Sequence, residues 1–170
     1  VVPDSLADIA RVAGAYQPFT DIVHVDITDG VFAPNKTWVP REGERLPAGM
    51  RYEAHLMVKN PHELGLLFAK AGAESIIGHA EAFAGAGNAK KAFDAWRAEG
   101  AKIVQTAALL KTPLQALEPY IILSDYILLM TIASIGVQGI PFDQSGMERV
   151  SELKKAHSEA KIAVDGGVSF

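Results

Sequence analysis

Two histidines and two aspartates each stand at or near the end of an apolar run that is typical of a β-strand. They are His24, Asp26, His55 and Asp165. Imidazole nitrogens and carboxylate oxygens are ligands for Zn²⁺, Fe²⁺, Mn²⁺ and Co²⁺, and a carboxylate can also accept or donate a proton. The four side chains therefore suit a site that binds one divalent metal ion and contains its own acid and base groups. Their spacing alone does not choose among these metals.

The alternation of side chains along a strand indicates which of these residues can meet. His24 and Asp26 share one face of their strand, and His55 and Met57 share one face of the next. If both faces point into the mouth of a barrel, His24, Asp26 and His55 converge, and Asp165 approaches from the far side. A single buried histidine or aspartate is more often a hydrogen-bonded structural residue. The residues alone therefore leave a metal site and a structural polar cluster both open.

Length and composition restrict the class of protein. The chain has 170 residues, 49% of them hydrophobic, so it can bury one core, and we expect a single domain over residues 1–170. The net charge of −4 includes no basic block, which argues against nucleic acid and membranes as partners. The absence of cysteine excludes disulfides, thiolate metal sites and thiol nucleophiles. Because the apolar runs are far shorter than the roughly 18 residues that span a bilayer, we expect a soluble, cytoplasmic protein.

Apolar, β-branched runs recur along the chain at roughly the spacing of strand-plus-helix units. The predicted strands cover residues 22–27, 52–58, 75–79, 102–106, 126–132 and 161–164. Segments of helical period lie between most of them, and the clearest cover residues 3–16, 60–71 and 145–158. The stretch 32–50 is rich in proline and glycine and lacks a period, which predicts a long loop. A long loop after a strand with polar residues is often functional.

Alternating strands and helices with near-continuous apolar strands predict an α/β fold with a parallel sheet covered by helices. A closed (β/α)₈ TIM barrel and an open doubly wound sheet both meet this description. Polar residues at the carboxyl ends of the strands, and the lack of a Gly-x-Gly-x-x-Gly fingerprint, favour the barrel. About six of eight strands are visible. We therefore expect an incomplete barrel, without one strand at the front and without a helix, strand and helix after the Gly166-Gly167 turn.

Five short motifs follow one another along the chain. They are HVDITDGVFAPN at 24–35, HLMVKNP at 55–61, HAE at 79–81, MT at 130–131 and VDGG at 164–167. In order and spacing they resemble the motifs of the ribulose-phosphate 3-epimerase family, from about Asp4 to the C-terminus. Any one motif would be weak evidence, whereas five in register indicate common ancestry.

The resemblance implies a role for the four strand-end residues. His24, Asp26, His55 and Asp165 would bind one divalent metal ion, either Zn, Fe, Mn or Co. Asp26 and Asp165 would also be the catalytic acid and base, on opposite faces of the substrate. The implied reaction inverts C3 of a ketopentose phosphate through an enediolate and interconverts D-ribulose 5-phosphate and D-xylulose 5-phosphate. Inversion without a further cofactor needs two facing bases, which explains the residue types.

The resemblance also implies a binding site for a small phosphorylated sugar. Met57 and Met130 would line this site. Its phosphate would be held by glycines of two turns, namely Gly136, Gly139, Gly166 and Gly167. The same resemblance implies a homo-oligomer for the full-length protein.

Two departures from the family pattern concern the expected substrate site. Thr28 stands where the family usually has methionine, and the loop 133–139 replaces Asn-Pro-Gly-Phe-Gly-Gly with one added residue. Two alternative hypotheses therefore stay open. One is a related phosphosugar lyase or decarboxylase of the same barrel superfamily, against which the absence of a D-x-K-x-x-D pattern argues. The other is a sugar-phosphate-binding pseudoenzyme without turnover.

Overall fold

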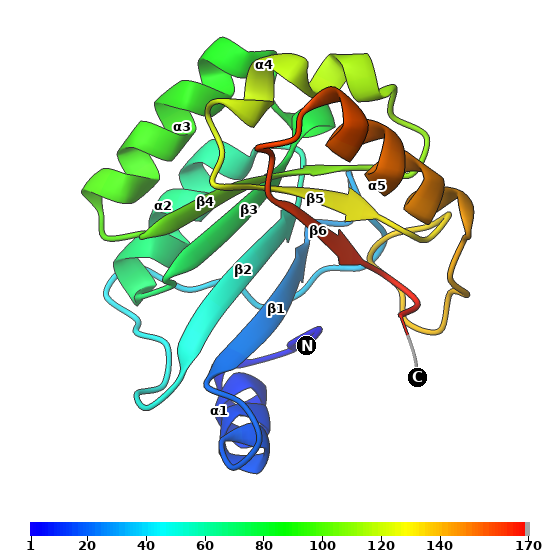
Figure 1. Cartoon of the computed structure of the whole chain (residues 1–170). Helices are drawn as coiled ribbons and strands as arrows, with labels where there is room; N and C mark the ends of the chain where they lie inside the picture. The colour runs from blue at the N-terminus through cyan, green and yellow to red at the C-terminus, as the bar shows by residue number, and fades with distance from the viewer. Residues whose placement is uncertain (169–170) are drawn as a thin grey trace.

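The computed structural model describes residues 1–168 and contains one sheet of six parallel strands. The strands pair in sequence order, so β1 and β6 form the two edges (Figure 1). They are β1 (Ile22–Thr28), β2 (Arg51–Met57), β3 (Ser75–His79), β4 (Ile103–Ala108), β5 (Tyr126–Met130) and β6 (Ile162–Asp165). The curled sheet is an incomplete (β/α)₈ barrel, as predicted. Each predicted strand is confirmed, with ends that move by two residues or fewer.

Helices cover the convex side of the sheet (Figure 1). They are α1 (Leu6–Tyr16), α2 (Pro61–Ala71), α3 (Ala86–Ala98), α4 (Glu118–Ile121) and α5 (Ser145–Ala156), with short 3₁₀ turns η1 (Ala80–Ala82) and η2 (Leu114–Leu117). Between β1 and β2 the described chain forms the predicted long loop, which one isolated bridge from Asp29 to Lys36 ties back on itself.

Two helical predictions need correction. The helix predicted from Pro3 begins at Leu6, because Ser5 caps it and its hydroxyl accepts a hydrogen bond from the Asp8 N–H at 3.2 Å. The helical period of residues 145–158 places Met147 on one face with Leu153 and so predicts that both are buried. In α5, however, Met147 is 42% exposed, whereas Leu153 is buried. The helical period shows on which face of a helix a side chain lies. It does not show which turns of that face the sheet covers.

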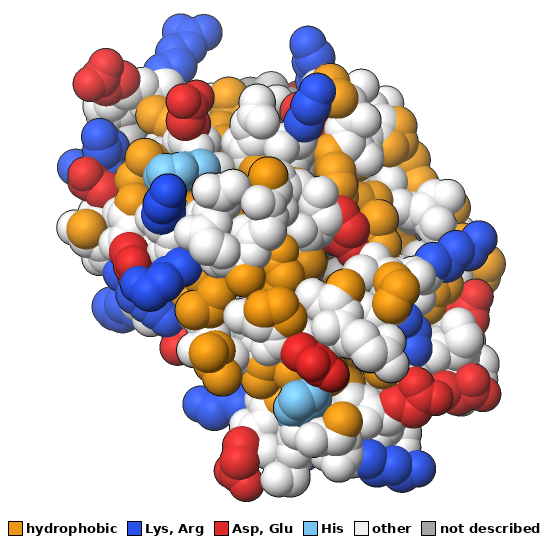
Figure 2. Space-filling model, turned by 90° about the horizontal axis from the view of Figure 1, so that it is seen from above, with side chains coloured by type: hydrophobic (Ala, Val, Ile, Leu, Met, Phe, Trp, Pro, Cys, Tyr) orange, Lys and Arg blue, Asp and Glu red, His pale blue; other side chains and the backbone are white. Residues whose placement is uncertain are grey.

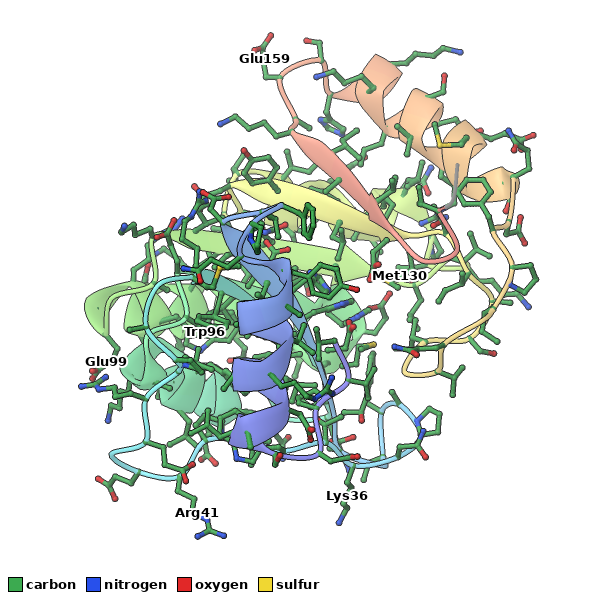
Figure 3. All side chains as sticks on the ribbon, turned by 90° about the horizontal axis from the view of Figure 1, so that it is seen from below. Lys36, Arg41, Trp96, Glu99, Met130 and Glu159 are labelled. Atoms are coloured by element: carbon green, nitrogen blue, oxygen red, sulfur yellow. The ribbon has the colours of Figure 1, made fainter. Side chains whose placement is uncertain are left out.

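The two faces of the sheet differ in character. Side chains that point outward pack against the helices in the main hydrophobic core, and Trp96 of α3 is fully buried in this layer (Figure 3). On β1 and β2 these outward residues are Val23, Val25, Ile27, Tyr52, Ala54 and Leu56. The opposite face of the same strands includes His24, Asp26, Thr28, Glu53, His55 and Met57. A smaller hydrophobic cluster, which includes Met57, Ile77 and Met130, lies on this inner side.

Charges of both signs are interspersed on the surface. In the face that Figure 2 shows, lysine and arginine side chains stand beside aspartate and glutamate side chains around the outline, and hydrophobic side chains gather nearer the middle. Within residues 1–168, no helix combines the length and the apolar character that a bilayer crossing requires.

Candidate metal and substrate site

The four strand-end residues lie together inside the curled sheet. His24 and Asp26 come from β1, His55 comes from β2, and Asp165 comes from β6 at the opposite edge. One possible ligand atom from each residue lies within 4.8 Å of the other three. Atoms that each lie about 2 Å from one ion must lie within roughly this distance of one another. The curl of the sheet therefore adds the aspartate of β6 to the three residues of β1 and β2, and we call these four residues the His/Asp cluster.

Two imidazole nitrogens of the His/Asp cluster lack a hydrogen-bond partner. His24 Nε2 lies 3.2 Å from Asp26 Oδ1, and His55 Nδ1 lies 3.4 Å from a carboxylate oxygen of each aspartate. Both nitrogens are buried, and neither makes a hydrogen bond. Because an unpaired buried polar atom reduces stability, these atoms suit a cation that accepts their lone pairs. The donor set thus fits a divalent metal ion.

A carboxylate lies behind His24. The Nδ1 atom of His24 is 2.8 Å from Oε1 of Glu53. The other oxygen of Glu53 accepts hydrogen bonds from Ser75 Oγ at 2.9 Å and from the side-chain amide of Gln105. Burial opposes a charge on His24, but the nearby carboxylates of Asp26 and Glu53 outweigh it and raise the pKa of the imidazole to about 10. Without a metal ion, His24 is thus protonated at pH 7 and positively charged, and a bound metal ion would replace the proton on Nε2.

A second histidine lies behind His55. The Nε2 atoms of His55 and His79 are 2.9 Å apart, and both side chains are fully buried. His79 Nδ1 lies 3.4 Å from Glu81 Oε2, while Glu81 Oε1 accepts hydrogen bonds from the Leu109 N–H at 2.9 Å and from the Thr112 hydroxyl. Burial lowers the pKa of His79 to about 4, although Glu81 opposes this shift. His79 is therefore neutral at pH 7.

Both aspartates of the His/Asp cluster are ionised. Burial by itself raises the pKa of Asp26, but the close imidazoles of His24 and His55 outweigh it and lower this pKa far below its usual range. Burial also opposes ionisation of Asp165, and His55 again lowers the pKa of the carboxyl group. At pH 7 both side chains are carboxylates, the form that binds a cation or accepts a proton.

A cavity of about 440 Å³ adjoins the His/Asp cluster. Asp26, Asp165, Met57 and Met130 line it, and Figure 3 shows Met130 at the end of β5 beside β6. The loop after β5 and the turn after β6 complete the lining, including Gly136, Gly139, Gly166 and Gly167. A small ligand in this cavity would contact both aspartates at once.

The turn after β6 requires glycine. Gly166 has a φ of 108° and Gly167 a φ of 68°, and a Cβ on Gly166 would lie 2.7 Å from a side-chain carbon of Ile132. Thr131 fixes the same turn, because its hydroxyl donates to the carbonyls of Asp165 at 2.9 Å and Gly166 at 2.5 Å. These contacts hold β6 against β5 at the point where Asp165 faces the cavity.

The two departures from the family pattern contact each other. Thr28 is 2% exposed, and its hydroxyl has no hydrogen-bond partner. A Cβ on Gly136 would lie 3.1 Å from Thr28 Cγ2 and 2.8 Å from Ala33 Cβ. The loop 133–139 therefore packs tightly on residue 28, so the size of that side chain and the path of the loop are coupled.

The structure brings together every residue that the sequence singled out. The two aspartates, two methionines and four glycines line the cavity, and the two histidines lie beside it in the His/Asp cluster. Sequence reasoning did not assign site roles to Glu53, His79 and Glu81. The strand period places Glu53 on the face of His55, and the other two residues belong to the His-Ala-Glu motif. Their contacts with the cluster required the pairing of neighbouring strands.

Comparisons with known proteins agree with this geometry. A family model described as the ribulose-phosphate 3 epimerase family matches residues 4–170. The chain is 32% identical over 158 residues to ribulose-phosphate 3-epimerase of Bacillus subtilis, covering 88% of this chain and 70% of that protein. It is 31% identical over 171 residues to ribulose-phosphate 3-epimerase of Chlamydia muridarum, covering 96% and 72%. It is also 31% identical over 157 residues to the chloroplastic ribulose-5-phosphate-3-epimerase of Arabidopsis thaliana, covering 88% and 54%.

Proposed function

Because this chain belongs to the ribulose-phosphate 3 epimerase family, we propose that it inverts C3 of a ketopentose phosphate and interconverts D-ribulose 5-phosphate and D-xylulose 5-phosphate. The observation that carries the proposal is the joint position of Asp26 and Asp165. Both carboxylates line one cavity of about 440 Å³, and both belong to the His/Asp cluster. Inversion at a single carbon needs a base on one face and an acid on the other, and this pair supplies them.

The two aspartates divide the proton transfers between them. One carboxylate removes the C3 proton from one face of the sugar and leaves an enediolate. The other carboxylate takes up a proton from water when the sugar binds and delivers it to C3 from the opposite face. The two groups have then exchanged protonation states, so the pair is set for the reverse reaction. Because a carboxylic acid exchanges its proton with water, hydrogen from solvent enters C3.

The His/Asp cluster would hold the metal ion of this reaction. When bound to His24, Asp26, His55 and Asp165, a divalent ion supplies positive charge for the oxygens at C2 and C3. Two imidazoles and two carboxylates accept Zn²⁺, Fe²⁺, Mn²⁺ or Co²⁺.

The remaining lining residues would bind the sugar phosphate. Met57 and Met130 form an apolar wall and are 3% and 2% exposed, so they keep water from the reacting carbons. The glycines of the two turns let the backbone approach the phosphate, because no Cβ intervenes. These are Gly136, Gly139, Gly166 and Gly167.

The test follows hydrogen at C3 by NMR. In D₂O, the protein loaded with each of the four metals in turn is incubated with D-ribulose 5-phosphate. We expect D-xylulose 5-phosphate that carries deuterium at C3, and we expect Asp165→Asn to lose this product. A folded preparation that binds no metal would contradict the proposal, and cleavage or loss of CO₂ would favour a lyase or decarboxylase of the same superfamily.

A sugar-phosphate-binding pseudoenzyme is the second candidate. The altered loop 133–139 favours it, because residues of this loop line the cavity next to Asp26 and Asp165. Metal binding and sugar-phosphate binding without deuterium exchange would support this alternative.

Several broader expectations stay predictions. They are a single domain over residues 1–170, a homo-oligomer, a cytoplasmic location, and the lack of nucleic-acid or membrane partners. They rest on composition and on the resemblance to the family.

A further inference from the structure

We propose that the two histidines of the His/Asp cluster are fixed in opposite tautomers by side chains that lie behind them. Glu53 holds His24 with its proton on Nδ1, and His79 holds His55 with its proton on Nε2. His24 then presents Nε2 and His55 presents Nδ1 to the same ion. The inference rests on the proposed metal-dependent function, and it assigns positioning roles to two residues outside the proposed ligands.

Glu53 determines the tautomer of His24. A neutral imidazole has one proton, and its other nitrogen has the lone pair that binds a metal. His24 Nδ1 lies 2.8 Å from an ionised oxygen of Glu53, which can only accept a hydrogen bond. Ser75 and Gln105 both donate to the other oxygen, so the carboxylate is held in place. When a metal ion displaces the proton of Nε2, the remaining proton therefore stays on Nδ1. The lone pair then lies on Nε2, which is buried without a hydrogen bond.

His79 determines the tautomer of His55. The two Nε2 atoms are 2.9 Å apart, so one must donate and the other must accept. His55 Nδ1 faces carboxylate oxygens of Asp26 and Asp165 at 3.4 Å each, which makes it the nitrogen aimed at the ion. His55 Nε2 therefore has the proton and donates the hydrogen bond, and His79 Nε2 accepts this hydrogen bond. The proton of His79 then lies on Nδ1, which faces the carboxylate of Glu81 at 3.4 Å.

Packing keeps the His55–His79 pair in this arrangement. The two ring planes differ by 13° and the ring centroids are 5.1 Å apart, a geometry in which the rings meet edge to edge along the nitrogen–nitrogen contact. Phe32 packs on His79 with a centroid distance of 5.1 Å, and both imidazoles are 0% exposed. Water therefore does not compete for the hydrogen bond, and rotation of either ring would break it.

The two histidines differ as metal ligands because their second ring nitrogens have different partners. A partner that accepts the second ring proton raises the basicity of a metal-binding imidazole, and such partners typically change metal affinity by about 10- to 100-fold. His24 is supported by a charged carboxylate, whereas His55 is supported by a neutral imidazole. We therefore expect His24 to be the stronger donor of the two.

NMR of the Zn²⁺-loaded full chain, labelled with ¹⁵N-histidine, tests the tautomers directly. Two-bond ¹H–¹⁵N correlations should show a protonated Nδ1 in His24 and a protonated Nε2 in His55. The same tautomer in both rings would overturn the inference, and so would a failure to bind Zn²⁺. Turnover is measured on the same preparation. Opposite tautomers without turnover would leave the inference standing and count against the epimerase.

Substitutions of His79 test its positioning role. Zn²⁺ affinity is measured by competition with a chromophoric chelator. We expect His79→Leu, which lacks an acceptor, to bind Zn²⁺ about 10- to 100-fold more weakly. His79→Gln should retain most of the affinity, because the oxygen of the glutamine side chain can accept a hydrogen bond from His55 Nε2. Equal loss in both variants would contradict a role for the acceptor.

The control for these variants is Thr106→Val. Thr106 is also 0% exposed, and its hydroxyl pairs with Ser124 at 2.7 Å, outside the His/Asp cluster and its partners. This variant loses a buried hydrogen bond and should keep wild-type Zn²⁺ affinity. A matching loss of affinity in the control would mean that a looser fold is the cause. If His79→Leu does not fold, the His79→Gln affinity and the wild-type NMR result still decide the question.

Discussion

On β1 and β2, the side chains that point toward the helices are apolar and buried, whereas most of the inward side chains are polar. On the outer face, an apolar side chain of similar volume can replace another at a small cost in stability. On the inner face, binding of an ion needs a nitrogen or oxygen at a fixed position, so a change of residue type removes the ligand. Because side chains alternate along a strand, these two strands contribute to the hydrophobic core with one face and to the candidate site with the other.

Packing alone does not explain the inner face. The Nε2 of His24 and the Nδ1 of His55 are buried without hydrogen bonds, and buried polar atoms in this state reduce stability. An ion that binds the folded chain would offset this loss. Substitutions on the two faces should therefore have different effects, on activity for the inner face and on stability for the outer face.

The largest expected effect is on the inner face. Asp26→Asn and Asp165→Asn each remove a base, and we expect kcat to fall by about 10²- to 10⁴-fold, with little change in melting temperature. The matched outer-face variant is Val25→Ala, next to Asp26 on the same strand and 1% exposed. It should lower the melting temperature and keep kcat. If either aspartate variant kept its turnover, the claim that inner-face residues determine activity would be wrong.

The second largest effect is expected on the outer face, as a loss of stability. Trp96 is fully buried, and its indole N–H donates to the His62 carbonyl at 2.9 Å. Trp96→Ala should lower the free energy of unfolding by about 3 to 5 kcal/mol, as measured by denaturant titration. Zn²⁺ affinity of the folded fraction should stay at the wild-type value, since Trp96 does not contact the His/Asp cluster.

A double-mutant cycle sharpens this prediction. A Cβ on Gly65 would lie 2.2 Å from the Trp96 ring, so Gly65→Ala should destabilise the wild type by about 1 to 3 kcal/mol. In the Trp96→Ala background the same change should cost much less, because the cavity accepts the methyl group. Equal costs in both backgrounds would show that the two residues do not contact each other in solution.

Glu81 links the inner face to the pH dependence of stability. Burial opposes its charge, but hydrogen bonds from His79, Thr112 and Leu109 outweigh it and lower the pKa of the carboxyl group from 4.5 to about 2. A lowered folded-state pKa contributes stability above pH 4.5, and this contribution is lost as pH falls toward 2. Glu81 is partly exposed and solvent screens its charge, so the contribution is well below the roughly 3 kcal/mol to which the full pKa difference corresponds.

Chemical denaturation from pH 7 to pH 2 measures this contribution. The difference in free energy of unfolding between wild type and Glu81→Gln should be largest at neutral pH and shrink below pH 4.5. A constant difference across this range would mean that the charge of Glu81 does not stabilise the fold.

The smallest effect on stability is expected at the protein surface, away from both faces of the sheet. Lys90 and Asp94 form an ion pair on the solvent-facing side of α3, and their side chains are 60% and 63% exposed. Lys90→Ala should change the free energy of unfolding by only about 0.3 to 0.5 kcal/mol, and salt should screen even this. A change as large as that of Trp96→Ala would show that surface charge matters more than core packing in this chain.

Much of the fold could be predicted from the sequence alone, because the signals are local. Apolar runs and their spacing located all six strands, and the period of two separated His24 and Asp26 from Val25 on β1. Motif order pointed to the family that the comparisons support. The first turn of α1 and the exposure of Met147 were predicted wrongly, because capping by Ser5 and the extent of the sheet are not visible in helical periodicity.

Tertiary structure decided which side chains meet. The register pairs His24 with Glu53 and Asp26 with His55, and the next pairing brings β3 and its His79 beside β2. The curl of the sheet brings Asp165 of β6 to the same point. Register and curl depend on the packing of every helix against the sheet, so no single segment encodes them. The sequence by itself thus determined the four candidate ligands, and only the folded sheet decided which nitrogen of each histidine faces the ion.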